Sequence, residues 1–175
     1  MEVFECIKTR RSVRRFEDRP VERETIQKIV DAAIWAPSWK NSQTPRYTVV
    51  DKREIIDDIA ENGCCGFAFN TKTLKQTPVL IVVSYVKGIC GFEKDGSYST
   101  DKKEGWQMFD AGVAAQTFAL AAHAQGVGTV MRIFRKSLEF HRPRKLPCYL
   151  LLDMKNLHQM HRQERRQRTC FASCK

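Results

Sequence analysis

The sequence predicts a single domain of the α+β class, on three observations. Two long helical patterns cover residues 22–35 and 106–125. Between them, residues 78–86 (PVLIVVSYV) form an apolar, largely β-branched run, which predicts a strand buried on both faces. Helical and strand patterns are mixed along the chain without regular alternation, which favours α+β over a doubly wound α/β sheet. A chain of 175 residues is long enough for one such domain with a substantial core.

The first two predicted elements are helices. Val3, Phe4 and Ile7 fall on one face of a short helix at the N-terminus. Pro20 then marks an extended or turn segment. Within residues 22–35, apolar side chains recur at the i, i+3, i+4, i+7 spacing of an amphipathic helix. These are Ile26, Ile29, Val30, Ala33 and Ile34.

The middle of the chain contains loops and shorter elements. Residues 36–45 (APSWKNSQTP) form a loop rich in Pro, Ser and Asn. Residues 46–51 (RYTVVD) predict a short strand, and residues 53–62 predict another helix. Residues 88–105, beyond the buried strand, form a polar loop.

The predicted helix over residues 106–125 is rich in small side chains. These are Ala111, Gly112, Ala114, Ala115, Ala119, Ala121 and Ala122. Small side chains allow close helix packing, so we expect this helix in the core or at a dimer interface. Gly126 and Gly128 follow it and are expected to end it as a C-cap.

Positive charge is concentrated towards one end of the chain, whose net charge is +10. Residues 1–130 carry 18 Lys/Arg and 17 Asp/Glu, a net charge of +1. Residues 131–175 carry 12 Lys/Arg and 3 Asp/Glu, a net charge of +9. The main body therefore has no general basic character that would indicate a nucleic acid or an acidic membrane as partner.

Three features favour a cytoplasmic location. No apolar stretch reaches the ~18 residues that a membrane span needs, and MEVFECIKTRR has no apolar core of a signal peptide. Seven Cys is an odd number without regular spacing, so no disulfide framework is predicted. The adjacent Cys64 and Cys65 lack a CxxC pattern or a His partner, and we expect no metal site.

A basic cluster follows the first helix, in the segment RRSVRRF. It contains Arg10, Arg11, Ser12 and Arg14. Planar guanidinium groups donate several hydrogen bonds to phosphate oxygens, and a Ser hydroxyl with free backbone amides can complete such a site. Arginine clusters are also common on solvated surfaces, so this segment alone leaves both interpretations open.

Four segments in this order resemble the nitroreductase family of flavin enzymes. They are RRSxRxF near the N-terminus, APSxxNxQ about 25 residues further on, the strand beginning at Pro78, and DAGVAAQTFALAAHAQGVGTV. The resemblance covers Met1 to about Val130 and is closest to small single-domain members.

The resemblance implies an intertwined homodimer with a central, mainly antiparallel sheet flanked by helices, and FMN bound at the subunit interface. Residues implied to hold the flavin phosphate and ribityl chain are Arg10, Arg11, Ser12 and Arg14. Residues implied to lie at the isoalloxazine ring are Pro37, Ser38, Asn41, Gln43 and, at its polar edge, Asn70. Backbone contacts from the end of the long helix would come from Gly128 and Thr129.

The implied activity is transfer of two electrons from NAD(P)H to a nitroaromatic, a quinone or a similar acceptor. The flavin N5 carries this chemistry, so no catalytic side chain is expected. His123 is expected to be a packing or surface residue. Two alternatives stay open: a flavin-fold protein without reductase turnover, and a nucleic-acid binder that uses the Arg-rich tail. Because the tail has no regular basic helix face, we expect no nucleic acid as partner. Because no apolar stretch is long enough for a span, we expect no membrane partner.

The resemblance stops after Val130. The family pattern continues with a Gly-containing turn, a helix ending near GIP, a strand ending ALGY and a closing APxRK, whereas residues 131–175 contain no Gly. Codons that can encode these residues also recover much of that family pattern when they are read one base earlier. Leu152–Gln163 can then read LGYEESAPNAPT, Glu164–Cys174 is compatible with RKEAEDLLRFL, and Glu139–His141 is compatible with GIP or GVP.

We therefore interpret the tail as an out-of-frame translation, begun by one missing base between the codons of Val130 and Glu139. The predicted organisation is a nitroreductase-like FMN-binding domain over residues 1–134 and an atypical basic tail, partly disordered, over residues 135–175. The apolar segment LPCYLLLDM can still take the place of the lost strand. Loss of the RK pair would remove cationic contacts to the flavin phosphate, so weaker FMN retention and lower stability are expected.

Overall fold

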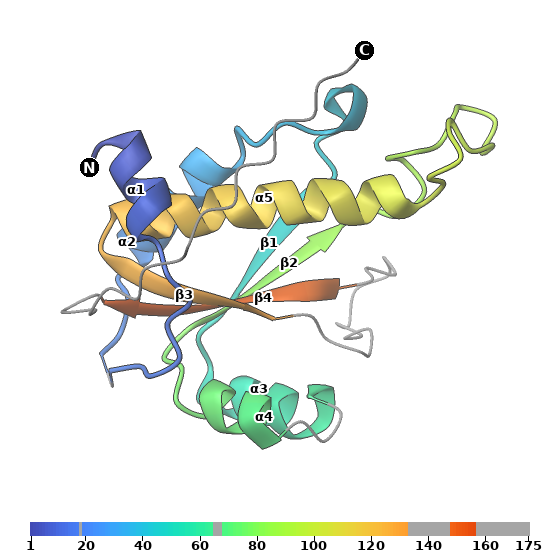
Figure 1. The fold of residues 1–175 in the computed structure, drawn as a ribbon. Helices are drawn as coiled ribbons and strands as arrows, with labels where there is room; N and C mark the ends of the chain where they lie inside the picture. The colour runs from blue at the N-terminus through green and yellow to red at the C-terminus, as the bar shows by residue number, and fades with distance from the viewer. Residues whose placement is uncertain (18, 65–67, 133–147, 157–175) are drawn as a thin grey trace, which may run out of the picture.

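The structure is a computed structural model that describes residues 1–17, 19–64, 68–132 and 148–156. Its centre is a four-stranded antiparallel sheet in the order β1-β2-β4-β3 (Figure 1). The strands are β1 (Pro45–Val50), β2 (Leu80–Tyr85), β3 (Val127–Arg132) and β4 (Cys148–Asn156). The predicted α+β class with a central antiparallel sheet is confirmed.

Helices cover both faces of this sheet (Figure 1). One face carries α2 (Arg23–Ala33) and the 20-residue α5 (Gly105–Ala124), with α1 (Val3–Thr9) packed against α5. The other face carries α3 (Arg53–Asp58), the π-helical turn η2 (Ile59–Gly63) and α4 (Ala68–Leu74). A 3-10 turn, η1 (Trp39–Asn41), precedes β1.

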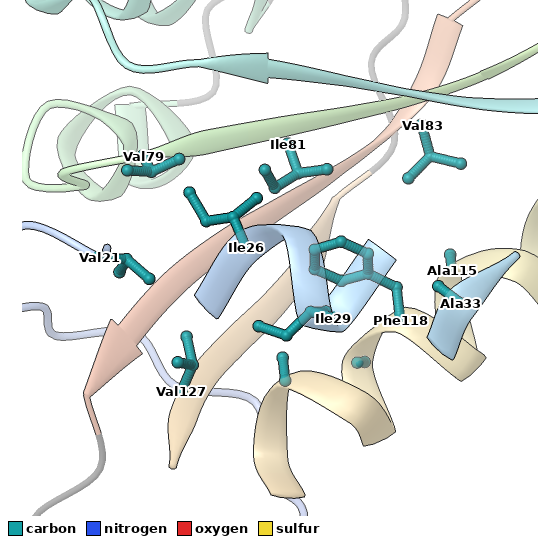
Figure 2. Close-up of a cluster of buried hydrophobic side chains, with 12 residues drawn as sticks. Val21, Ile26, Ile29, Ala33, Val79, Ile81, Val83, Ala115, Phe118 and Val127 are labelled. Carbon is teal, nitrogen blue, oxygen red and sulfur yellow. The ribbon is translucent and has the colours of Figure 1, made fainter. Parts of the chain in front are cut away.

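The larger core lies between the sheet and helices α2 and α5 (Figure 2). Phe118 of α5 is fully buried there, together with Ile29 of α2 and with Ile81 and Val83 of β2. The Tyr47 ring of β1 stacks on Phe118, with 5.5 Å between the ring centroids. Burial of each large apolar side chain contributes about 1.5–3 kcal/mol, so this cluster fixes α5 across the sheet.

A second core fills the opposite face of the sheet. Leu80 and Val82 of β2 pack there with Ile56 of α3 and Leu74 of α4. Side chains alternate along a strand, so odd-numbered residues of β2 face the α2–α5 layer and even-numbered residues face the α3–α4 layer. Every residue of β2 is buried. The prediction of a strand covered on both faces is confirmed.

Helix α1 forms where the sequence predicts a helix, but its apolar face points away from the core. Val3, Phe4 and Ile7 are 67%, 74% and 53% exposed, whereas Cys6 is the buried residue of this helix. The apolar stripe is therefore available for a contact outside the described fold.

The long helix ends at a glycine, as expected, but only one of the two expected glycines takes part. Gly126 follows α5 with a φ of 75°, the left-handed conformation typical of a residue after a helix. The expectation for Gly128 is wrong, because Gly128 lies inside β3. This strand begins directly after the turn at Gly126 and has a buried first half.

Of the remaining elements, β4 overlaps the apolar segment LPCYLLLDM and lies between β2 and β3; that it replaces a lost strand stays a prediction. Helix α4, strand β3 and turn η1 had no predicted counterpart. In the part of the chain that the structure describes, no helix is both long and apolar enough to cross a membrane.

Candidate functional site

The N-terminal helix is attached to the C-terminal end of α5. The Cys6 thiol donates a hydrogen bond to the Leu120 carbonyl at 3.3 Å. Thr9 Oγ1 lies 2.8 Å from His123 Nε2, which is a second bond between the same two helices. These contacts fix the point from which the basic segment leaves α1.

The basic segment then runs along the edge of β3. The Val13 N–H donates to the Thr129 carbonyl at 3.0 Å, and Ser12 and Thr129 form a parallel bridge. The structure thus brings together Ser12, Thr129 and the neighbouring Gly128, all expected at one site. Gly128 and Thr129 were expected at the end of the long helix, but they belong to strand β3.

The arginine side chains of this segment lie at the surface. Arg10 and Arg11 are partly exposed and Arg14 is exposed. Arg11 donates to the carbonyls of Lys8 at 2.6 Å and Arg10 at 2.9 Å, and Arg14 donates to the Ser12 carbonyl at 3.4 Å. No carboxylate among the described residues forms an ion pair with Arg11 or Arg14. Their positive charge is therefore available to an anion.

The loop from Pro37 to Gln43 closes on itself. Ser38 Oγ accepts a hydrogen bond from the Gln43 N–H at 2.9 Å, and Gln43 Nε2 donates to Asn41 Oδ1 at 3.3 Å. The φ angles of Lys40, Asn41 and Gln43 are 46°, 53° and 49°. Non-glycine residues rarely adopt this left-handed conformation, and several together indicate a loop shape fixed by its surroundings.

A buried carboxylate holds this loop from below. The Trp39 N–H donates to Asp110 of α5, at 3.2 Å from Oδ1 and 3.0 Å from Oδ2. The Cys90 thiol donates to the same Oδ2 at 3.0 Å. Burial of Cys90, with its hydrogen bond to Asp110, raises the pKa of this thiol to about 12, so it stays protonated. Asp110 was not among the residues expected from the sequence.

The predicted residue Asn70 lies in α4 and contacts the far end of β3. The Arg132 guanidinium donates to Asn70 Oδ1 and also lies 5.5 Å from the centroid of the Phe69 ring. These contacts join α4 to the strand that carries Thr129. Arg132 was missed as well, because it lies just beyond Val130, where the motifs recognised in the sequence end.

Apart from Asn70, which lies in α4 on the other face of the sheet, the predicted residues form two groups that are attached near opposite ends of α5 (Figure 1). Ser12 comes three residues after Thr9, which contacts His123, and Thr129 pairs with Ser12. The 37–43 loop is attached to α5 at Asp110. A helix rises about 1.5 Å per residue, so Asp110 and His123 lie about 20 Å apart along α5. Within one copy of the chain, the basic segment and the loop are therefore separated.

Comparison with known sequences gives consistent matches. A sequence model of the nitroreductase family matches residues 7–68 and 68–147. A Methanothermobacter thermautotrophicus protein, provisionally named an NADH dehydrogenase/NAD(P)H nitroreductase, is 37% identical over 130 residues, which are 74% of this chain and 60% of that protein. The Bacillus subtilis protein FMN reductase (NAD(P)H) is 27% identical over 136 residues, 74% of this chain and 53% of that protein. The chain thus spans between half and two thirds of the length of these relatives.

Solved structures extend the similarity to the fold. A nitroreductase family protein from Clostridium novyi has a TM-score of 0.72 and 28% identity, covering 89% of this chain and 84% of that one. A provisionally named nitroreductase from Desulfovibrio desulfuricans, crystallised in complex with FMN, has a TM-score of 0.70 and 26% identity, covering 95% and 92%. With the sequence match over most of its length, this similarity shows that the chain belongs to the nitroreductase family.

Proposed function

We propose that this chain binds FMN and transfers two electrons from NAD(P)H to a nitroaromatic, a quinone or a similar small-molecule acceptor. Family membership supports the proposal, as do the FMN reductase name of the Bacillus subtilis relative and the FMN in the Desulfovibrio desulfuricans structure. The observation that carries it is the pairing of Ser12 with Thr129, which holds the arginine segment against the sheet.

The N-terminal segment fits the phosphate of FMN. Arg10, Arg11 and Arg14 supply charged donors to a dianion, and Ser12 adds a hydroxyl. Hydrogen bonds to a charged group contribute roughly 1.5–3 kcal/mol each, so two or three of them supply a substantial part of the free energy of cofactor binding. We assign these residues to the phosphate and ribityl chain, beside the backbone at Gly128 and Thr129.

The 37–43 loop fits a flat ring with a polar rim. Pro37 offers apolar surface, and Ser38, Asn41 and Gln43 offer groups that donate and accept hydrogen bonds. We assign Asn70 to the polar edge of the ring, on the side of the phosphate group, because it contacts the strand that carries Thr129.

We propose a homodimer in which each flavin takes its phosphate group from one copy and its ring loop from the other. Within one copy, the two groups are attached to α5 at His123 and Asp110, which lie about 20 Å apart along the helix, and this supports the arrangement. The exposed apolar face of α1, with Val3, Phe4 and Ile7, supports a partner surface at the end of α5 that lies beside the basic segment. Sedimentation of the purified chain at its mass of 20.3 kDa, at micromolar concentration, would contradict the homodimer.

The chemistry of the proposed reaction belongs to the cofactor. Bound FMN accepts and donates electron pairs, while this chain's residues bind it, orient its ring and hold it at a subunit boundary. We assign no catalytic role to any side chain. We also propose a cytoplasmic location, where NAD(P)H is available and where thiols such as those of Cys6 and Cys90 remain reduced.

A pair of variants tests the assignment of the phosphate site. We expect Arg14→Ala to weaken FMN binding about tenfold, because it removes one charge-assisted donor. The matched control is Arg23→Ala, because Arg23 is also exposed and pairs with Asp51 at 3.0 Å, outside the assigned site. The measurements are flavin fluorescence titration and the rate of NAD(P)H oxidation.

The same measurements separate the candidate functions. A wild-type chain that binds no FMN contradicts the proposal. FMN binding without NAD(P)H oxidation favours the alternative of a flavin-fold protein without reductase turnover. An equal loss of FMN affinity in both arginine variants would show that general positive charge, rather than the assigned site, attracts the cofactor.

A further inference from the structure

Asp110 is a buried carboxylate with a defined set of partners. The residue is 1% exposed, and it accepts hydrogen bonds from the Trp39 N–H at 3.0 and 3.2 Å and from the Cys90 thiol at 3.0 Å. Burying a carboxylate costs free energy that its hydrogen bonds only partly offset, and an apolar side chain would fill the same space at lower cost. Packing alone therefore does not explain why a carboxylate is buried at this position. Its hydrogen bond to the Trp39 amide explains it.

That bond fixes the start of the 37–43 loop. Trp39 is the first residue of η1 and follows Ser38, whose Oγ closes the loop through the Gln43 N–H. The backbone is left-handed at Lys40, a conformation that persists only where the surroundings hold it. On the other side of the loop, Lys40 pairs with Glu93 at 3.0 Å, but these side chains are 59% and 46% exposed and hold it weakly.

We propose that Asp110 is a positioning residue for flavin binding: through the Trp39 amide, it fixes the loop that presents Ser38 and Asn41 to the ring. This inference rests on the proposed function and names a further determinant of the same site. Asp110 acts through the backbone of the loop and touches neither the flavin nor a substrate. Cys90 helps to hold the Asp110 side chain in place, because its protonated thiol donates to the same carboxylate.

The test compares three variants. Asp110→Leu fills the space without an acceptor, and Asp110→Asn keeps one oxygen for the Trp39 amide. Glu93→Gln is the control, because it removes the exposed charge that holds the same loop through Lys40. The FMN dissociation constant is measured by flavin fluorescence at one protein concentration. The visible absorption band of bound flavin is recorded with it.

The expected order follows from the acceptor that each variant retains. In Asp110→Leu the partly buried Trp39 amide loses its acceptor, so we expect FMN binding to be about tenfold weaker or more, with a shifted visible band. Asp110→Asn should lose about threefold, because its oxygen still accepts from Trp39. Glu93→Gln should bind FMN like the wild type.

Stability and wild-type measurements complete the test. If Asp110→Leu melts at a lower temperature but its folded form binds FMN with wild-type affinity and an unchanged band, the inference is overturned. If this variant does not fold, Asp110→Asn decides in the same way. In the wild-type protein, the Trp39 amide should exchange its hydrogen slowly, and exchange at the rate of an unstructured peptide would also overturn the inference. A wild-type chain that binds no FMN removes the proposed function and this inference together, an outcome distinct from the others.

Discussion

At the C-terminal end of α5, the surroundings of His123 favour its neutral form. Thr9 Oγ1 donates its own hydrogen to the Glu5 carbonyl at 2.6 Å, so it accepts from the His123 Nε2–H at 2.8 Å. Burial lowers the pKa of His123, and the positive charges of Arg10 and Arg11 lower it further, while Glu5 acts in the opposite direction. His123 is therefore a packing residue, one of the two roles expected for it from the sequence.

The lowered pKa of His123 predicts a pH dependence of stability. Below pH 6.5, the ordinary pKa of histidine, the unfolded chain binds a proton that the folded chain resists, so the free energy of unfolding falls as the pH falls. The loss ends once the pH passes the lower pKa of the folded state. Urea unfolding between about pH 5 and 8 measures this slope. His123→Gln should flatten it, and an unchanged slope in this variant would assign the effect to another group.

Single residues could be predicted only where a local motif marks them. RRSxRxF and APSxxNxQ identify their residues by order and spacing, so the resemblance could supply them. Asp110 opens the family-like segment that begins DAGVAAQ, but that segment does not indicate its role, because its partner Trp39 lies 71 residues away and only the folded chain brings the two together. The contact between Asn70 and Arg132 likewise joins residues 62 positions apart. Roles that depend on distant contacts require the fold.

At the scale of elements, the joint between α5 and the sheet depends on Phe118. We predict that Phe118→Ala lowers the free energy of unfolding by about 3–5 kcal/mol, because it opens a cavity where the ring is fully buried beside Tyr47. Gln116→Ala, at an exposed position on the same helix, is the control and should cost less than about 0.5 kcal/mol. Urea unfolding measures both. A loss below about 1.5 kcal/mol in Phe118→Ala would show that the core can close over the vacated space.

Elements were predictable in proportion to the length and regularity of their patterns. The apolar run of β2 and the long helix α5 fall close to the predicted residues. Strand β3 is six residues long and includes Gly128, so it shows little strand pattern by itself and forms by pairing with β4. Helix α4 has a polar sequence (AFNTKTL), and its contact with the second core, through Leu74, appears only in the fold.

For the whole molecule, the sheet depends on a segment of the basic tail. Strand β4 pairs with β2 on one side and β3 on the other, so β3 joins the rest of the sheet through β4. Other tail residues, 133–147 and 157–175, lie outside the described residues. The division into a domain at 1–134 and a partly disordered tail at 135–175 stays a prediction, as does the out-of-frame origin of the tail.

The origin of the tail can be tested on the gene and on the protein. We predict that one added base between the codons of Val130 and Glu139 restores an ending that contains LGYEESAPNAPT followed by RK. The protein with the restored ending should retain FMN more tightly and melt at a higher temperature, because the cationic contacts of the RK pair return. Calorimetry and flavin content compare the two proteins. Stoichiometric FMN in the present chain, with a cooperative melt above about 65 °C, would contradict this prediction.

The basic segment and the 37–43 loop lie near opposite ends of α5, and this arrangement affects how the protein retains its cofactor. If each flavin is shared between two copies, a separated copy offers only one of the two groups to a given flavin, and dissociation of the pair releases FMN. Cofactor content then depends on the abundance of the polypeptide as well as on the supply of flavin. Dilution of the purified protein would by itself release FMN and remove its visible absorption.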